Sequence, residues 1–445
     1  MSQFFISAFY FVIVIGFMVL IHEFGHYAVA KLLGVRVEQF AIGFGKRLFG
    51  FRRGETDYRI NALPFGGYVK MSGENPMDER TGDPREFMSH SRWHRFLIAI
   101  AGPVMNILLA IVLLTGVYMV HYEHPVYLDQ PAVVGWVEHG SPAEKRGIKP
   151  GDRIVQIDGV QNPTWEEVEE KQLLSANQPL SFVVQRGDQE INGSVVPVSV
   201  TNSGAGAAGW TPYEPVIIGD LEPGMPAAKA GLKPGDKILS SDGKPVPSIQ
   251  AMIDSLQQSK NKSFPLVVER DGQTLTFNVT PVLADTPGAA EKHYRLGFRN
   301  SYETKVTKLP FPEAFSHSLA DNKRYSRILL QLVGKLIRNK ASPKMFSGPI
   351  GIAEETGEAA QEKGWTPLLG LCAAISLNLG IFNLLPIPIM DGGVILLLFI
   401  ESLMRRDISL QIKERIYQAA FVFLILFAAM VIYNDIAKTI AQRLP

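Results

Sequence analysis

The stretch His22-Glu23-Phe24-Gly25-His26 lies at the inner end of an apolar run that begins at Phe4 and carries no charge through Ile21. In a helix, residues four apart share a face, so the two imidazoles can bind one metal ion, and Glu23 lies one step round the helix. H-E-x-x-H is the pattern of zinc hydrolases, with the glutamate as general base. Because five residues match by chance often, the pattern predicts a metal site only if a third ligand exists elsewhere.

A secretory signal peptide is the alternative for this run, because Ala28-Val29-Ala30 resembles a cleavage site. The residues before Phe4 include no Lys or Arg, and the run is longer than the ~7 to 15 residues of a signal peptide's apolar region. We therefore expect a membrane-spanning helix.

The composition excludes several classes of protein. The 445 residues are 46% hydrophobic and 20% charged, which is apolar for a soluble chain of two or three domains. Lys and Arg number 44 against 43 Asp and Glu, so no basic field indicates nucleic acid. Cys372 is the only cysteine, which excludes an intramolecular disulfide and a cysteine-based zinc site.

Four segments are long enough to cross a bilayer, which takes ~20 apolar residues. We place them within residues 1–33, 96–121, 366–403 and 414–438. The connections 34–95 and 401–415 are rich in Lys and Arg, so the positive-inside rule predicts that both are cytoplasmic. Both termini and the long insert would then be periplasmic, and the metal would lie within the membrane, toward the cytoplasm.

The region 34–95 reads as strands, because β-prone and alternating stretches flank Gly43-Phe44-Gly45, which we expect to form a turn. We predict a membrane-associated β-hairpin whose free edge can pair with an extended peptide. A solvated cytoplasmic loop is the alternative.

The insert contains an internal repeat. Ser141–Ile154 returns at Met225–Ile238 with a constant offset of 84, and Asp158-Gly159 returns at the same offset. We place the two modules at 126–200 and 212–300, joined by a flexible linker at 201–206.

The two modules resemble tandem PDZ domains of the circularly permuted bacterial type, with a mixed β/α fold. PDZ modules bind an extended peptide at a sheet edge. The resemblance implies that the strands before each repeat line the peptide grooves, at Val134, Gly135, Ile218 and Gly219. The alternative is that the modules serve only as steric bulk.

After the repeat, residues 310–362 have apolar side chains at helical spacing and basic side chains on the other faces. We predict amphipathic helices that lie on the outer membrane surface or cover the spans. Packing against the repeat modules is the competing interpretation.

The third span supplies the missing ligand. Pro386 and Pro388 prevent an undisturbed helix, so the backbone should open there. A charged Asp391 in mid-bilayer costs ~2.5 to 3.5 kcal/mol and is therefore functional by default. No basic residue in a predicted span can pair with it, which makes a metal the favoured partner.

These motifs together resemble the site-2 protease family of intramembrane zinc proteases. The resemblance rests on His22-Glu23-x-x-His26, on Asn383-x-x-Pro386-x-Pro388-x-x-Asp391-Gly392, and on the segments 101–106 and 61–70. Met390 stands where the family usually has Leu, a conservative change. The implied fold is an α-helical polytopic membrane protein with four transmembrane helices, the hairpin region and two inserted periplasmic PDZ domains.

The resemblance implies a zinc metalloendopeptidase (EC 3.4.24.-) in a bacterial inner membrane. His22, His26 and Asp391 would hold Zn²⁺ and leave one position for water, from which Glu23 takes a proton. Four residues would contact the substrate: Asn378, Asn383, Pro386 and Pro388.

Expected substrates are single-span membrane proteins already trimmed outside the membrane, such as the anti-sigma factor RseA of the σE envelope-stress response, together with remnant signal peptides. The PDZ pair would act as a size filter. Two alternatives stay open: a membrane-anchored PDZ scaffold with a vestigial metal site, and a zinc transporter, which would need polar residues along a path through the spans.

Overall fold

The computed structural model describes residues 3–74, 81–200, 204–285, 292–301, 304–362 and 364–443. Its residues form two compact units, which we describe separately. The first unit contains the apolar helices and comprises Met1–Tyr122, Lys308–Leu330 and Ser347–Asp435. The second contains the internal repeat and comprises Glu123–Thr307, Gln331–Phe346 and Ile436–Pro445.

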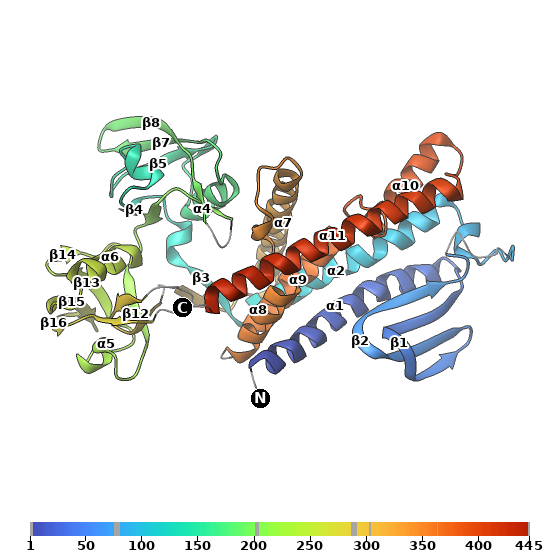
Figure 1. The fold of residues 1–445 in the computed structure, drawn as a ribbon, viewed down its shortest axis with the longest axis horizontal. Helices are drawn as coiled ribbons and strands as arrows, with labels where there is room; N and C mark the ends of the chain where they lie inside the picture. Colours follow the sequence, from blue (N-terminus) through green and yellow to red (C-terminus); the bar gives the residue numbers. More distant parts are fainter. Residues whose placement is uncertain are drawn as a thin grey trace. The chain divides into compact units, whose positions relative to one another are not determined.

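Four helices of the described chain are long and apolar enough to cross a membrane. They are α1 (Gln3–Leu32), α2 (Arg92–Val120), α9 (Thr366–Asn383) and α11 (Leu410–Arg443), which are labelled in Figure 1. The bounds of α1, α2 and α11 agree with three of the predicted segments to within five residues, whereas α9 covers only the first half of the segment 366–403. Their outward faces are apolar, as lipid requires: Phe5, Phe9, Ile13 and Phe17 recur every fourth residue of α1 and are each at least 45% exposed.

The third predicted span is two helices. α9 ends at Asn383, and α10 (Asp391–Met404) begins after a seven-residue connection, 384–390, that contains both prolines. The predicted opening of the backbone is therefore confirmed. The connection folds back over the start of α10, because a Cβ on Gly392 would lie 2.3 Å from the carbonyl oxygens of Leu384 and Leu385. The glycine after Asp391 is thus required by close packing of backbone on backbone.

The predicted hairpin is a pair of long strands, β1 (Val37–Arg53) and β2 (Thr56–Met71). Both strands bend, so residues 39–42 pair with 57–60 on one side and with 67–70 on the other. The segment ending at Met71 is therefore one edge of a four-segment sheet. The prediction of a turn at Gly43-Phe44-Gly45 is wrong: β1 continues through both glycines, whose positive φ values (78° and 87°) bend the strand instead.

In the second unit each repeat packs a helix against strands, which form a four-stranded and a two-stranded sheet in the first module and a six-stranded sheet in the second. The first module contains β4 (Val134–Val137), β5 (Arg153–Ile157), α4 (Trp165–Leu174), β7 (Leu180–Arg186), β8 (Gln189–Val195) and β11 (Trp210–Pro212). The second contains β12 (Val216–Leu221), β13 (Lys237–Ser241), α6 (Ile249–Ser259), β15 (Phe264–Arg270), β16 (Gln273–Val279) and β19 (Phe298–Ser301). Shorter elements complete the unit: β3 (Tyr122–Pro125), η2 (Val126–Asp129), α3 (Pro142–Lys145), β6 (Val160–Gln161), β9 (Val198–Ser199), β10 (Gly206–Ala207), α5 (Pro226–Lys229), β14 (Lys244–Pro245), β17 (Val282–Ala284), β18 (His293–Arg295), β20 (Thr304–Thr307) and η3 (Pro343–Met345).

The two modules repeat the same ion pair, between a buried aspartate and a partly exposed arginine, at the offset of 84. Arg186 donates to both oxygens of Asp152, and Arg270 donates to both oxygens of Asp236, at 2.6–2.7 Å. The first module extends past its predicted end at residue 200, because β11 pairs with β4. Residues 201–203 of the predicted linker lie outside the described residues, and Gly206 belongs to β10 rather than to a linker.

The predicted amphipathic region forms α7 (Phe311–Ile337) and α8 (Pro349–Gln361). The first part of α7 packs on α2: Ser318 donates to the Ile111 carbonyl at 2.9 Å, and Tyr118 donates to Asp321 at 2.7 Å. This part of α7 therefore covers a span, which is one of the predicted placements. The remaining short element of the first unit is η1 (Phe87–Ser89).

Candidate metal centre

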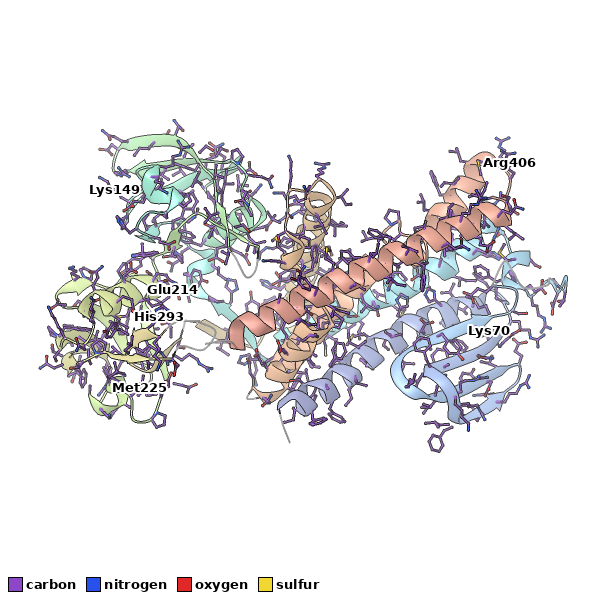
Figure 2. The ribbon with its side chains drawn as sticks, in the orientation of Figure 1. Lys70, Lys149, Glu214, Met225, His293 and Arg406 are labelled. Carbon is purple, nitrogen blue, oxygen red and sulfur yellow. The ribbon has the colours of Figure 1, made fainter. Side chains whose placement is uncertain are left out.

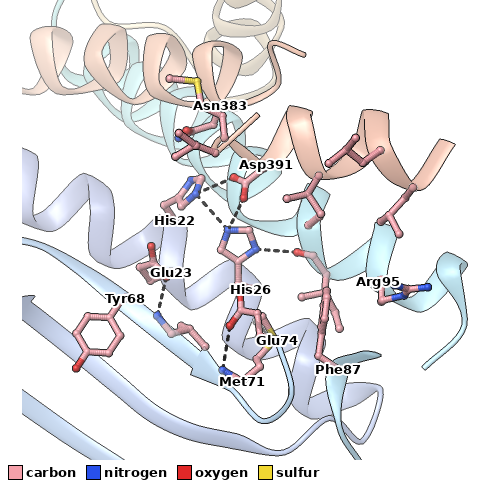
Figure 3. Close-up of a pocket in the computed structure, with 18 of the residues that line it drawn as sticks. His22, Glu23, His26, Tyr68, Met71, Glu74, Phe87, Arg95, Asn383 and Asp391 are labelled. Atoms are coloured by element: carbon pink, nitrogen blue, oxygen red, sulfur yellow. Dashed lines mark hydrogen bonds and ion pairs between the residues drawn. The ribbon is translucent and has the colours of Figure 1, made fainter. Parts of the chain in front are cut away.

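Three side chains from the two ends of the chain converge in the first unit. His22 and His26 lie on one face of α1, and Asp391 is the first residue of α10 (Figure 3). The two Nε2 atoms are 3.2 Å apart, and the Asp391 oxygens lie 3.1 Å from His22 Nε2 and 3.4 Å from His26 Nε2. Both histidines are more than nine-tenths buried, with exposed fractions of 6% and 8%.

The spacing of these atoms fits a tetrahedral metal ion. Zinc binds imidazole nitrogen and carboxylate oxygen at about 2.0–2.2 Å, so two ligand atoms at tetrahedral corners lie roughly 3.4 Å apart. The observed separations of 3.1–3.4 Å match this value. The two ring nitrogens and the carboxylate each direct an electron pair toward the same point. A cation at that point is bound by all three groups.

A second layer of contacts fixes both rings. His26 Nδ1 donates to the Ile98 carbonyl of α2 at 2.8 Å. The Asn106 amide faces His22 Nδ1 at 3.3 Å, while Asn106 Oδ1 is buried without a partner. If His22 binds metal through Nε2, its Nδ1 carries the proton and needs an acceptor. A flip of the amide, which is nearly symmetric in shape, supplies Oδ1 and removes the orphaned atom.

Glycines make room for this arrangement where α1 and α2 cross. A Cβ on Gly102 would lie 2.3 Å from His26 Nε2 and 2.8 Å from His22 Nε2. A Cβ on Gly25 would lie 2.4 Å from the Ala101 carbonyl oxygen. The space beside the two ring nitrogens therefore exists only because position 102 has no side chain.

Glu23 lies between the metal ligands and the sheet. Its Oε2 accepts a hydrogen bond from the Val69 backbone N–H at 2.9 Å. Val69 belongs to the edge segment of β2, so this outward N–H shows that the free edge of the sheet faces Glu23. A pocket of about 550 Å³ joins these groups and is lined by His22, Glu23, His26, Tyr68, Val69, Asn383 and Asp391, among others.

Of the four residues predicted to contact the substrate, one lines the pocket and three do not. Asn383, the last residue of α9, lines the pocket. Asn378 is exposed and does not line the pocket, because five residues along a helix correspond to a rotation of roughly 140° from Asn383. Pro386 and Pro388 shape the connection between α9 and α10 and do not line the pocket either.

The predicted peptide-groove residues do not offer a free strand edge. Ile218 and Gly219 lie on β12, which pairs with β13 on one side and with β19 on the other. Val134 and Gly135 lie on β4, which pairs with β11 and also contacts the start of β5 through Val134. Val134 and Ile218 are buried in their module cores. The predicted groove therefore needs correction: the free edges belong to β11 and β19, which follow each repeat in the sequence rather than precede it.

Two residues of the site were missed by reasoning from the sequence. Asn106 lies in the segment 101–106 that carries part of the family resemblance, but the sequence gives it no role at the site, whereas in the structure its side chain faces His22 Nδ1. Val69 acts through its backbone, so no side-chain pattern identifies it. A polar residue four positions after Gly102, within an otherwise apolar span, was the available signal for Asn106.

Comparison with known proteins finds a family model and relatives that match most of the chain. The model of peptidase family M50 matches residues 10–427. A putative zinc metalloprotease of Neisseria meningitidis is 31% identical over 456 residues, covering 96% of this chain and 98% of its own. The regulator of sigma-E protease RseP of Escherichia coli K12 is 30% identical over 469 residues, with the same two coverages. A solved PDZ domain of an SdrC-like protein from Listeria monocytogenes is 21% identical, with a TM-score of 0.18, and covers 20% of this chain and 90% of its own.

Proposed function

Because the chain belongs to peptidase family M50, the site-2 proteases, we propose that it is a zinc endopeptidase that cleaves single-span proteins inside the bacterial inner membrane. The observation that carries the proposal is the convergence of His22, His26 and Asp391 beside Glu23, at the inner end of an apolar helix. Zinc, when bound there, activates water and polarises the scissile carbonyl.

Glu23 moves the protons of the reaction. One carboxylate oxygen is held by the Val69 N–H, which leaves the other free to accept a proton from water and to pass it to the leaving amine. Asn383 lines the same pocket, where its amide can donate to the substrate backbone or to the developing oxyanion.

The edge of β2 presents the substrate. A transmembrane helix hides its carbonyl groups in hydrogen bonds, so it must become extended before attack. The segment from Gly67 to Met71 has a free edge that faces Glu23, and an extended peptide can pair with it by strand addition. The scissile bond is thereby placed between the sheet edge and the metal ligands.

The substrates follow from the relatives and the architecture. Since similar proteins are named regulators of sigma E, we infer that an anti-sigma factor of the RseA type, trimmed on its outer side, is one substrate, and that remnant signal peptides are others. The positive-inside rule places the repeat modules in the periplasm with both termini. There they exclude substrates that retain a bulky outer domain.

The two modules are proposed to be peptide-binding PDZ domains. The support is the unpaired edge of β19 in the second module and of β11 in the first, since a PDZ module receives its peptide on a sheet edge. A substrate gains a new C-terminus when its outer domain is removed, and such a terminus is the kind of ligand that a PDZ domain binds.

Purified protein tests the proposal with a single-span model substrate that has either a short or a folded outer segment. Glu23→Gln should abolish cleavage and retain zinc, whereas Glu55→Gln, which removes a surface carboxylate paired with Lys31, should cleave normally. Wild-type protein that binds no zinc and cuts neither substrate would favour the scaffold alternative. Equal cleavage of both substrates would refute the size filter alone.

A further inference from the structure

Glu74 presents a carboxylate at the mouth of the pocket that holds the metal ligands. It lines this pocket together with His26 and Asp391, and its side chain is exposed. Its Oε2 accepts a hydrogen bond from the Met71 N–H at 3.2 Å (Figure 3). A carboxylate accepts hydrogen bonds at both oxygens, so Oε1 can receive a further donor while Oε2 holds the group against the edge of β2.

The contact of Glu74 with the sheet edge lies two residues beyond that of Glu23. The outward N–H of Val69 donates to Glu23, and the outward N–H of Met71 donates to Glu74. Positions two apart on a strand are separated by about 6.6 Å. A peptide held between this edge and the metal ligands therefore passes Glu74 about two residues from the bond that faces Glu23.

With the proposed topology, Glu74 lies on the cytoplasmic side of that bond. The edge segment runs in the same direction as α1: a Cβ on Gly66 would lie 3.8 Å from a Val19 methyl group, and Val69 reaches Glu23 one helical turn later. α1 leads into the connection rich in Lys and Arg, which the positive-inside rule places in the cytoplasm. Glu74 therefore faces the cytoplasmic part of a bound substrate.

No cation pairs with Glu74 in the part of the chain that the structure describes. Lys70, which Figure 2 shows on the sheet of β1 and β2, pairs with Glu38 Oε2 at 3.0 Å. Arg95 also lines the pocket, but its guanidinium points away from the metal ligands (Figure 3). The positive-inside rule enriches Lys and Arg at the cytoplasmic ends of single-span proteins, and such residues complement this carboxylate.

We propose that Glu74 is a specificity-determining residue that favours substrates with a Lys or Arg about two residues from the scissile bond on its cytoplasmic side. The proposal rests on the protease function proposed above and names a feature of its substrates. A basic side chain at this position donates to the carboxylate in a charge-assisted hydrogen bond. The long stems of Lys and Arg allow the contact from neighbouring positions as well. An Asp or Glu in the same place is repelled.

Cleavage of matched single-span substrates by the full-length protein in detergent tests this selectivity. Each substrate carries one Lys, Gln or Glu at one of the first ~four positions on the cytoplasmic side of the scissile bond. At the best position, wild-type kcat/KM should be ~5-fold higher for Lys than for Gln and ~5-fold lower for Glu than for Gln, as expected for partly exposed charges. Glu74→Gln should reduce both ratios below ~2-fold, and Glu74→Lys should invert them.

Glu55→Gln is the matched control, because Glu55 lies in the turn between β1 and β2, pairs with Lys31 and does not line the pocket. It should keep the wild-type ratios. Equal cleavage of the Lys, Gln and Glu substrates by wild-type protein would overturn the selectivity and leave the protease function intact, as would a preference that persists in Glu74→Gln. Wild-type protein that cleaves none of the substrates would overturn both proposals.

Discussion

Replacement of Gly102 by Ala tests the geometry of the metal centre without removing a ligand. The new methyl group would lie 2.3 Å from His26 Nε2 and 2.8 Å from His22 Nε2. Ordinary contacts between such atoms are about 3.5–4.0 Å, so the His26 ring must move by roughly 1 Å or more. Metal–ligand distances tolerate only about 0.2 Å, and we therefore expect zinc affinity to fall at least 10- to 100-fold.

The fold should survive this substitution. Inserting a methyl group into a packed interior costs about 1–3 kcal/mol, which displaces side chains rather than unfolding a bundle of helices. Gly116→Ala is the matched control on the same helix, since no atom lies within 4 Å of its added methyl group. It should keep wild-type zinc affinity and cleavage.

The assay is zinc retention against a graded chelator, measured by elemental analysis, together with cleavage of the single-span substrate and thermal unfolding of each variant. The Gly102→Ala protein should unfold close to wild type when both are metal-free and should need far more zinc for cleavage. Zinc affinity within twofold of wild type would refute the assignment of these three side chains as the metal site.

Three further outcomes follow from single residues. Asn106→Ala should weaken zinc binding ~10- to 100-fold, because His22 loses the partner that fixes its ring, and unchanged chelator resistance would contradict this role. Asp435→Ala should lower the unfolding temperature of the full chain by removing the carboxylate that accepts three backbone N–H groups at the start of α8, at 3.0–3.1 Å, with a cost of about 2–5 kcal/mol; a loss below ~1 kcal/mol would count against it. For Glu214, burial followed by the charge of Glu169 raises the pKa from 4.5 to about 7, so the folded state holds the proton more tightly and stability falls as pH rises across this window. Glu214→Gln should therefore stabilise the protein by up to about 3 kcal/mol at pH 8 and by almost nothing at pH 4.5, whereas a pH-independent difference in thermal unfolding would be inconsistent with the raised pKa.

Much of the site was predictable because its chemistry is local or unusual for its surroundings. His22 and His26 share a face through helix periodicity alone. Asp391 stood out because a carboxylate in an apolar span needs a cation, and the structure places its oxygens 3.1–3.4 Å from the two rings. The prolines before Asp391 marked the end of α9 for an equally local reason, since they break its hydrogen-bond ladder.

The peptide grooves were misplaced because strand pairing is not a local property. The repeat identified β4 and β12 correctly as strands, but their edges are covered by β11 and β19, which lie about 75–80 residues later in the chain. Neither partner strand belongs to the recognisable repeat motif. The turn expected at Gly43-Phe44-Gly45 failed for a similar reason, because glycine with positive φ permits a bulge as readily as a turn and the pairing of the whole sheet selects between them.

The sequence by itself determined which segments are long and apolar enough to cross a membrane, that two modules repeat, and which side chains can bind a metal. Hydropathy, periodicity and the cost of a buried charge depend only on individual residues and their spacing. Only the tertiary structure decided that Val69 holds Glu23, that Asn106 orients His22, that Gly102 leaves space for both rings, and that β11 and β19 are the open edges. These features depend on backbone atoms and on contacts between distant segments. A backbone N–H is the same in nearly every residue, so its role appears only once the chain around it has been placed.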